Sequence, residues 1–229
     1  MTESSTEFIV SATAERYIRA ERATVHVTVS ARSENSKSDA YNTVAAVHSR
    51  LEAQARAFRH GSPSAATWHH ATAPASHSFK EAWKNDGETE PRHRTVFVTS
   101  SSIEVKFQDF DAMSDWLAAL ADEPLVSSGA PTWTLTERTH SEAESKVRTQ
   151  AVKNARKYAT DFAAGEDIEA SSLHLAKVDA TISAAPAHAV AVGSALRGAG
   201  SGNNASFAVT PTEVKVAAFV TATFTTTEV

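Results

Sequence analysis

Histidine is the residue type in this chain best suited to chemistry. Four of its ten histidines fall close together, at His69, His70, His77 and His93, where paired strands would bring the imidazoles near one another. Zinc needs three or four converging nitrogen, sulfur or oxygen ligands with supporting hydrogen bonds. The chain has no cysteine and no His-x₃-His spacing of a helical site. We therefore expect no metal and no cofactor, and we interpret these histidines as surface residues.

Other catalytic patterns are equally weak. The stretch GAGSGNN at 198–204 is rich in glycine but lacks the lysine of a phosphate-binding loop. No G-x-S-x-G motif is present, and a Ser/His/Asp triad stays open because it is recognised in space. We predict a protein that is not an enzyme. The alternative is a hydrolase or a metal-binding protein with a site near the hairpin 64–95 or under the segment 181–211.

Three residues are candidates for contact with a partner. Trp83 lies beside a charged turn, where an exposed indole is available to another molecule. Arg148 falls within the apolar stripe of a predicted helix, where it either pairs with Glu142 or Glu144 or contacts an anion or a partner. Phe219 lies on the polar side of the last strand.

Composition excludes several classes of protein. The 229 residues are 41% hydrophobic, enough for a large core, and we predict a single domain over 1–229. The net charge is −5 with scattered lysines and arginines, which argues against a nucleic-acid partner. The start of the sequence lacks the features of a signal peptide, and no apolar run reaches the ~18 residues of a membrane span. We therefore expect a cytoplasmic protein without a membrane span.

Alternation of apolar and polar residues predicts the strands. Valines and alanines occupy every second position of 23–31, and the same pattern returns in 213–225. The short run 8–10 precedes the first of these strands and is expected to form a hairpin with it. Residues 64–107 read as a long hairpin, and 130–138 as a further strand.

Apolar residues at helical spacing predict helices over 38–60, 109–122 and 141–164. The segment 181–211 is rich in small residues and is interpreted as a mobile loop. The order β-β-α-β-β-α-β-α-β-β favours an α+β fold. We expect one antiparallel sheet with the long helices 38–60 and 141–164 packed on one face.

The helix 141–164 repeats alanine at every fourth residue, at Ala151, Ala155, Ala159 and Ala163. On a helical wheel, these methyl groups share one face with Tyr158 and Phe162, opposite a lysine-rich face. Small side chains let a helix axis approach a sheet closely. We interpret the stripe as a packing seam whose gaps the two aromatic rings fill.

This helix also carries a resemblance. The segment VRTQAVKNARKYATDFAAG resembles the C-terminal helix of SIMPL-domain proteins, which shows an A-x₃-A-x₃-A repeat that Ala151, Ala155 and Ala159 match. SSIEVKFQDFDAMSDWLAAL is similar to the middle strand and helix of that family. The family's closing pattern is matched by Pro211, Val214, Val216, Ala218, Val220, Ala222 and Phe224.

The opening of the chain departs from the family pattern V-x-G-x-G followed by Pro-Asp. Ala12 and Ala14 replace the glycines, and Glu21-Arg22 replaces Pro-Asp. The resemblance implies an α+β protein without a catalytic residue set, from a family with many exported members and several linked to stress tolerance or self-assembly. It favours a non-catalytic binding or assembly protein, with a stress-related role as a further expectation.

We also predict a homo-oligomer. The second face of the sheet carries threonines together with the apolar Val96, Val98 and Phe219. Burial of these three side chains at about 25 cal/mol per Å² favours assembly, and Phe219→Asp is expected to disrupt it. The competing explanation is that the segment 181–211 covers this face within one chain.

Overall fold

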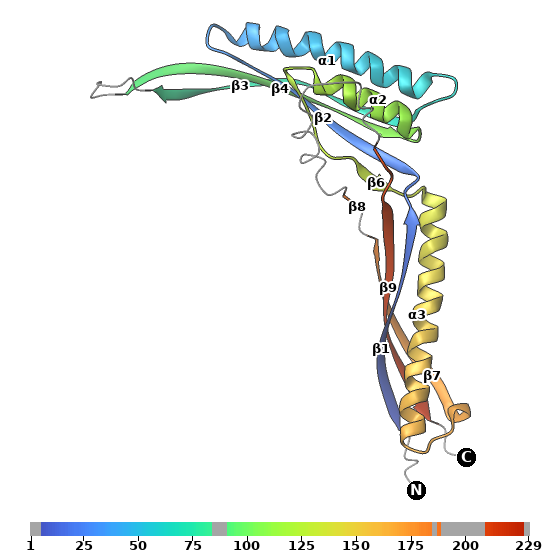
Figure 1. Cartoon of the computed structure of the whole chain (residues 1–229). Coiled ribbons are helices and arrows are strands. Elements are labelled where there is room, and N and C mark those ends of the chain that lie inside the picture. The colour runs from blue at the N-terminus through green and yellow to red at the C-terminus, as the bar shows by residue number, and fades with distance from the viewer. Residues whose placement is uncertain (1–5, 84–90, 185–186, 189–208, 227–229) are drawn as a thin grey trace, which may run out of the picture. The chain divides into compact units, whose positions relative to one another are not determined.

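A computed structural model describes residues 6–83, 91–184, 187–188 and 209–226 (Figure 1). The contacts divide the chain into two compact units, which are described separately. Unit 1 comprises 1–21, 134–187 and 212–229, and unit 2 comprises 22–133 and 188–211. The elements of unit 1 are β1 (Glu7–Arg19), α3 (Glu137–Gly165), the 3₁₀ turn η1 (Ala170–Ser172), β7 (Leu173–Ala184) and β9 (Glu213–Thr226).

The described strands of unit 1 form an antiparallel sheet in the order β1-β9-β7. One face of β9 is buried and the other is turned away from α3. The buried residues of β9 follow a strict alternation: Val214, Val216, Ala218, Val220, Ala222 and Phe224. Val10, Ala12 and Ala14 of β1 are buried as well. The predicted alternation of 213–225 is confirmed.

Helix α3 packs on this sheet through a continuous row of small residues. The row is spaced by four throughout and is fully buried: Ala143, Val147, Ala151, Ala155, Ala159 and Ala163. The predicted seam is confirmed. Four residues turn a helix by about 400°, so the row winds around α3 by about 40° at each step. The buried side of α3 therefore rotates along the helix, as the twist of the strands beneath it requires.

This rotation explains why one prediction about the seam was wrong. Tyr158 and Phe162 were expected to fill the stripe, but both are exposed. A single wheel superimposes residues that lie several turns apart. Near Ala159 and Ala163 the buried direction has already moved well away from both rings, which leaves them beside the seam.

The α+β class and the antiparallel pairing are confirmed, but two expectations about the sheet are corrected. Strand β1 does not form a hairpin with 23–31; it pairs with β9, with Phe8 opposite Phe224. The predicted strands 23–31 and 213–225 lie in different sheets, so the two long helices do not share one sheet. Alternation shows which side of a strand is buried, but it does not identify the pairing partner.

Unit 2 contains the second sheet and two helices. Its sheet has the order β3-β4-β2-β6-β8, with β5 paired to β2. The elements are β2 (Arg22–Ser33), α1 (Lys37–His60), β3 (Ala66–Trp83), β4 (Arg92–Phe107), α2 (Phe110–Ala121), β5 (Val126–Ser128), β6 (Thr132–Thr134) and β8 (Ala187–His188). The chain passes from one unit to the other at 21–22, at 133–134 within β6, at 187–188 within β8 and at 211–212.

The predicted hairpin 64–107 is confirmed as the pair β3 and β4. The pairing shifts between Thr72 and Ala75, and Pro74 lies within this irregularity. Proline cannot donate to a strand ladder, so a bulge at an edge strand is a position that tolerates it. Helix α1 covers one face of this sheet, where His48 is buried and its Nδ1 lies 3.0 Å from Ser101 Oγ.

Several predicted boundaries change. The strand expected over 130–138 is limited to Thr132–Thr134, because Thr136 already caps α3. Residues 181–184 of the expected loop belong to β7. The remainder of 181–211 lies outside the described residues, except 187–188 and 209–211, so the mobility predicted for this segment stays a prediction.

The seam generates the first prediction. Ala155 is fully buried, whereas Ala164 on the same helix is exposed. Ala155→Leu forces extra volume between α3 and the sheet and is expected to lower the free energy of unfolding by about 1–3 kcal/mol. Ala164→Leu adds the same atoms at the surface and is expected to change it by less than about 0.5 kcal/mol. Urea denaturation followed by circular dichroism measures both, and equal effects would contradict the close-packed seam.

Candidate functional site

The three residues proposed for partner contact do not form one site. Trp83 is at the end of β3 in unit 2, exposed, with the Arg92 guanidinium 5.4 Å from the centre of its ring. In unit 1, Arg148 is exposed on α3. Phe219 lies on the face of β9 opposite the buried residues that α3 covers, and it is 48% exposed. Arg148 and Phe219 therefore lie on opposite sides of the sheet.

Arg148 does not make the ion pair that its sequence position suggested. Both nearby carboxylates have other partners: Glu142 lies 3.0 Å from Arg138 Nε, and Glu144 lies 3.6 Å from His140 Nδ1. The Arg148 guanidinium makes no ion pair with any described residue and stays available for a contact.

The histidines of the hairpin do not converge. His69 lies opposite the buried Val105, and the pKa of its imidazole is lowered, first by burial and then by the charges of Arg59 and Arg56. The neighbouring His70 points to the other face, stacked 6.1 Å from Trp68. Within the described parts of the chain, no three histidine, aspartate or glutamate side chains gather as a metal ligand set would.

The outer edge of β1 is the feature of unit 1 that sequence reasoning did not find. The Thr6 carbonyl accepts from Thr226 N at 3.0 Å, and Ala20 N donates to the Thr212 carbonyl at 3.0 Å. Antiparallel pairing makes every second residue point its backbone groups to the same side. Even-numbered residues of β1 therefore bond to β9, and odd-numbered residues present their N–H and C=O groups outward.

One outward group is already engaged. Asn154 Nδ2 on α3 donates to the Thr13 carbonyl at 2.8 Å. This bond is independent support for the outward orientation of the odd-numbered residues. Among the described strands β1 ends the sheet, so the outward groups of Ile9, Ser11, Glu15 and Tyr17 face no other strand of unit 1.

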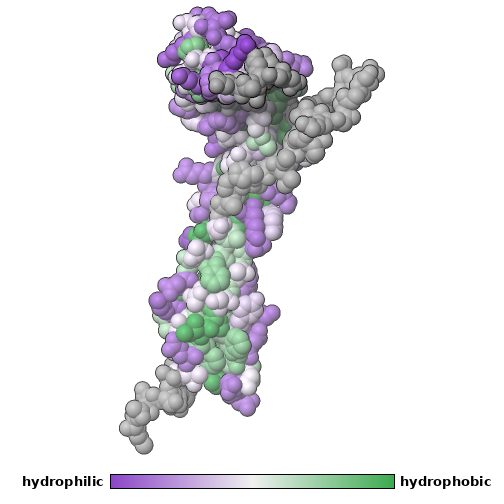
Figure 2. Space-filling model, turned by 90° about the vertical axis from the view of Figure 1, so that its left-hand side faces the viewer, coloured by the Kyte–Doolittle hydropathy of each residue, from purple (hydrophilic) through white to green (hydrophobic). Residues whose placement is uncertain are grey.

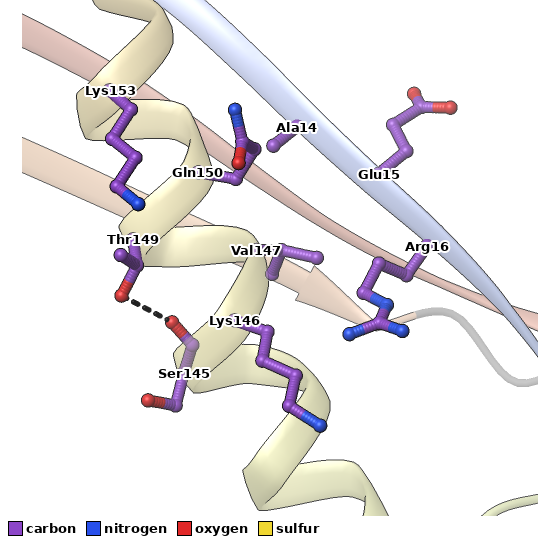
Figure 3. A pocket seen from close by; sticks show the side chains of 9 residues that line it. All are labelled: Ala14, Glu15, Arg16, Ser145, Lys146, Val147, Thr149, Gln150 and Lys153. Carbon is purple, nitrogen blue, oxygen red and sulfur yellow. Dashed lines mark hydrogen bonds between the residues drawn. The ribbon is translucent and has the colours of Figure 1, made fainter.

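Two hollows follow the line where β1 meets α3, one on each side of the Asn154 bond. The first has a volume of about 440 Å³ and is lined mostly by polar and charged residues (Figure 3). It is lined by Ala14, Glu15, Arg16, Ser145, Lys146, Val147, Thr149, Gln150 and Lys153. The second has a volume of about 350 Å³ and is lined by Ile9, Val10, Ser11, Tyr158, Asp161 and Phe162.

The second hollow carries exposed apolar side chains beside the free edge. Ile9 is 68% exposed and Phe162 is 58% exposed. Figure 2 shows such apolar side chains, in green, gathered on the surface of unit 1. Seven of the large exposed apolar residues among the described ones belong to this unit: Ile9, Tyr17, Tyr158, Phe162, Leu175, Val178 and Phe219.

Glu15 is oriented by a partner on the neighbouring strand. Its carboxylate lies 2.6 Å from Lys215 Nζ and accepts from the Tyr17 hydroxyl at 3.2 Å. The hydrogen bond from Lys215 is the main cause that lowers the pKa of Glu15, and the same bond raises the pKa of Lys215. The Glu15 charge is thus matched by Lys215.

Glu21 anchors the start of α3. One carboxylate oxygen, Oε2, accepts from both the backbone N–H and the hydroxyl of Thr136 at 2.7 Å, and the other accepts from the Thr139 hydroxyl at 2.9 Å. Thr136 in turn caps the helix by accepting from Thr139 N at 3.3 Å. The pair Glu21-Arg22, which departs from the family's Pro-Asp, therefore supplies a structural contact in this chain.

The comparison with known proteins now gives the family. The sequence model named SIMPL, described as a protein of unknown function (DUF541), matches residues 8–224. The chain belongs to the SIMPL family. No curated protein matches it. The match spans both units, so the edge of β1 and both hollows lie within the SIMPL domain.

None of the helices in the described ranges combines the length and the apolar character needed to cross a bilayer.

The Glu21 contact generates the second prediction. Glu21→Ala leaves Thr136 and Thr139 without their acceptor, and hydrogen bonds to charged groups contribute about 1.5–3 kcal/mol each at most. We expect the free energy of unfolding to fall by about 2 kcal/mol, with the start of α3 losing amide protection. Glu213→Ala removes an exposed carboxylate of β9 and serves as the control. Equal, small effects of both variants in urea denaturation would show that Glu21 does not anchor the helix.

Proposed function

We propose that this SIMPL-family protein is non-catalytic and acts by assembly, pairing with a second copy of itself through the outer edge of β1. The observation that carries the proposal is the row of outward backbone groups on β1 next to the apolar hollow of Ile9 and Phe162. An unprotected edge strand is a template for another strand. The 13 residues of β1 offer about 43 Å of such an edge.

The sequence of β1 supports a second copy as the partner. Two β1 strands can pair antiparallel with Thr13 of one copy opposite Thr13 of the other. Each odd-numbered residue then lies opposite an odd-numbered residue, so the outward N–H and C=O groups of both strands can bond to one another. Glu7 then faces Arg19, and Ile9 faces Tyr17. A pairing centred on Ser11 would place Glu7 opposite Glu15, and a pairing centred on Glu15 would place Glu15 opposite Glu15 of the second copy. Like charges directly opposite one another are destabilising.

The second copy competes with Asn154 at the centre of this pairing. The Thr13 carbonyl oxygen has two lone pairs, so it can accept a hydrogen bond from the partner strand. It does so whether Asn154 keeps its own bond to this oxygen or releases it. Exposed Glu7 and Arg19 form no ion pair with any described residue, so both are available to a partner. Side chains at the ends of β1 thus select the register, and the backbone supplies the ladder.

The proposed interface lies at the edge of the sheet and not on its open face. The face of the sheet was expected to assemble through the apolar groups of Val96, Val98 and Phe219. Val96 is buried within the chain, and Val98 belongs to unit 2, whereas Phe219 belongs to unit 1. The three side chains therefore do not form one apolar face, although Phe219 remains available for contacts.

The alternative, a hydrolase or a metal-binding protein with a site near 64–95, gains no support from the hairpin, because its described histidines lie on different faces. A stress-related role and a cytoplasmic location stay predictions.

The third prediction uses charge reversal. Glu7→Arg and Arg19→Glu each place like charges opposite one another at both ends of the paired strands. Each exposed pair contributes about 0.2–1 kcal/mol, so each variant is expected to weaken the dimer about tenfold. The double variant Glu7→Arg/Arg19→Glu restores opposite charges and should regain the affinity. A mixture of the two single variants should form a heterodimer as tight as the unaltered homodimer.

Light scattering after size exclusion gives the masses, near 24.4 kDa for a monomer and twice that for a dimer. Lys80→Glu in unit 2 is the control for a charge change alone. A mass of one chain at all micromolar concentrations would refute assembly. A dimer that neither single variant weakens would refute this register.

The fourth prediction separates the edge from the face. Phe219→Asp places a charge on the open face of β9 and should leave a dimer formed through β1 intact. Tyr41→Asp on α1 changes an exposed aromatic residue of similar exposure, 43%, and is the matched control. Loss of the dimer with Phe219→Asp but not with Tyr41→Asp would assign the interface to the face of the sheet.

A further inference from the structure

We propose that the polar hollow between β1 and α3 binds a small multivalent oxyanion of the phosphate class. All nine lining residues belong to unit 1 of one chain, so the inference does not depend on assembly. Its volume of about 440 Å³ lies within the range of small-molecule sites. A hollow of this size takes a small anion rather than a polymer.

Three cationic residues line this hollow. Arg16 extends from β1, and Lys146 and Lys153 extend from α3 (Figure 3). The two lysines are seven residues apart, so they differ by only about 20° around the helix and lie on one side of it. None of the three forms an ion pair with any described residue, although other lysines and arginines of unit 1 do.

The nearby carboxylates do not neutralise these cations. Glu15, which also lines the hollow, is paired with Lys215 at 2.6 Å. Figure 3 shows the Glu15 side chain directed away from Arg16 and from both lysines. Glu144, two residues before Lys146, lies 3.6 Å from His140. Three positive charges at one cavity are therefore without a negative partner among the described residues.

Two of the remaining polar side chains that line the hollow, Thr149 and Gln150, form hydrogen bonds along α3. The Thr149 hydroxyl donates to the Ser145 carbonyl at 3.0 Å, and Gln150 Nε2 donates to Asn154 Oδ1 at 2.9 Å. Asn154 in turn donates to the Thr13 carbonyl. This chain of bonds ties α3 to β1 beside the hollow, so the cations are mounted on two elements that are fixed to one another.

The chemistry of the cations favours phosphate oxygens. An arginine guanidinium presents a planar fork that binds two oxygens of a phosphate at once, and lysine ammonium groups add compact charges. Ala14 and Val147 add apolar groups to the wall, and the carboxylate of Glu15, which also lines it, is paired with Lys215. The net charge of −5 disfavours long polyanions over the whole surface, whereas a local site for a small anion is compatible with it.

The experiment titrates the full chain with sodium diphosphate in a calorimeter, at low salt and at about 0.15 M salt, where exposed charges are screened beyond ~8 Å. We expect saturable binding of one diphosphate per chain that weakens with salt. Arg16→Gln, Lys146→Gln and Lys153→Gln should each raise the Kd about tenfold, as the loss of one charge-assisted hydrogen bond predicts. Arg16→Lys keeps the positive charge but loses the planar guanidinium, so its Kd should lie between those of the unaltered chain and of Arg16→Gln.

Lys157→Gln is the matched control, because Lys157 is exposed on α3, one turn beyond Lys153, but does not line the hollow. It should bind diphosphate as the unaltered chain does. Thermal melts of each variant check that the fold is retained, which the exposure of all four side chains favours. Absence of saturable binding, or equal weakening by Lys157→Gln, would overturn the site. Equal or tighter binding of citrate would overturn the phosphate class.

Discussion

The close approach of α3 to the sheet of β1, β9 and β7 is the contact on which unit 1 depends. One helix covers one face of a small sheet, so most of the core of the unit lies in this single interface. The methyl groups of the alanine row are fully buried there, against the alternating valines and alanines of β9. Dispersion attraction falls quickly with separation, and a row of larger side chains would hold the helix further away.

A thin seam has consequences for the rest of the unit. Because the buried row winds around α3, the aromatic side chains Tyr158 and Phe162 lie outside it, next to β1. Because the helix covers one face only, the outward edge of β1 and the opposite face with Phe219 are left without a cover from described elements. The packing that stabilises the unit thus also creates the surfaces we propose for assembly and for anion binding. Glu21 fixes the start of α3, and Asn154 fixes its middle to β1.

The sequence predicted much of the local structure and less of its arrangement. Patterns of period two and of four-residue spacing gave the strand 213–225, the hairpin of β3 and β4, and the alanine seam, because each depends on residues near in the chain. The pairing of Phe8 with Phe224 is not visible in such patterns, since it joins the two ends of the sequence. The predicted order includes a strand between 141–164 and 213–225, but the lysine, aspartate and threonine of β7 interrupt the alternation, so its bounds could not be predicted.

The candidate site was harder to predict for the same reason. Arg16 and Lys146 are 130 residues apart and meet only because β1 pairs with β9 under α3. The sequence indicated three candidate contact residues because each differs from the type expected at its position: Trp83, Arg148 and Phe219. In the structure they lie on separate surfaces. A detectable signal did exist in Lys146 and Lys153, which share one side of the helix with Gln150. They could be recognised as part of a site only once β1, which carries Arg16, was known to lie beside them.

The most direct measurement of the central claim is residue-resolved amide exchange along β1 as a function of protein concentration. Even-numbered amides, such as those of Val10 and Ala12, bond to β9 and should be protected at every concentration. The outward amides of Ile9, Ser11 and Tyr17 should exchange rapidly in dilute protein and become protected as the concentration rises, since a second β1 strand then covers them. Outward amides that exchange equally fast at all concentrations, while the protein is measured as a dimer, would contradict the account.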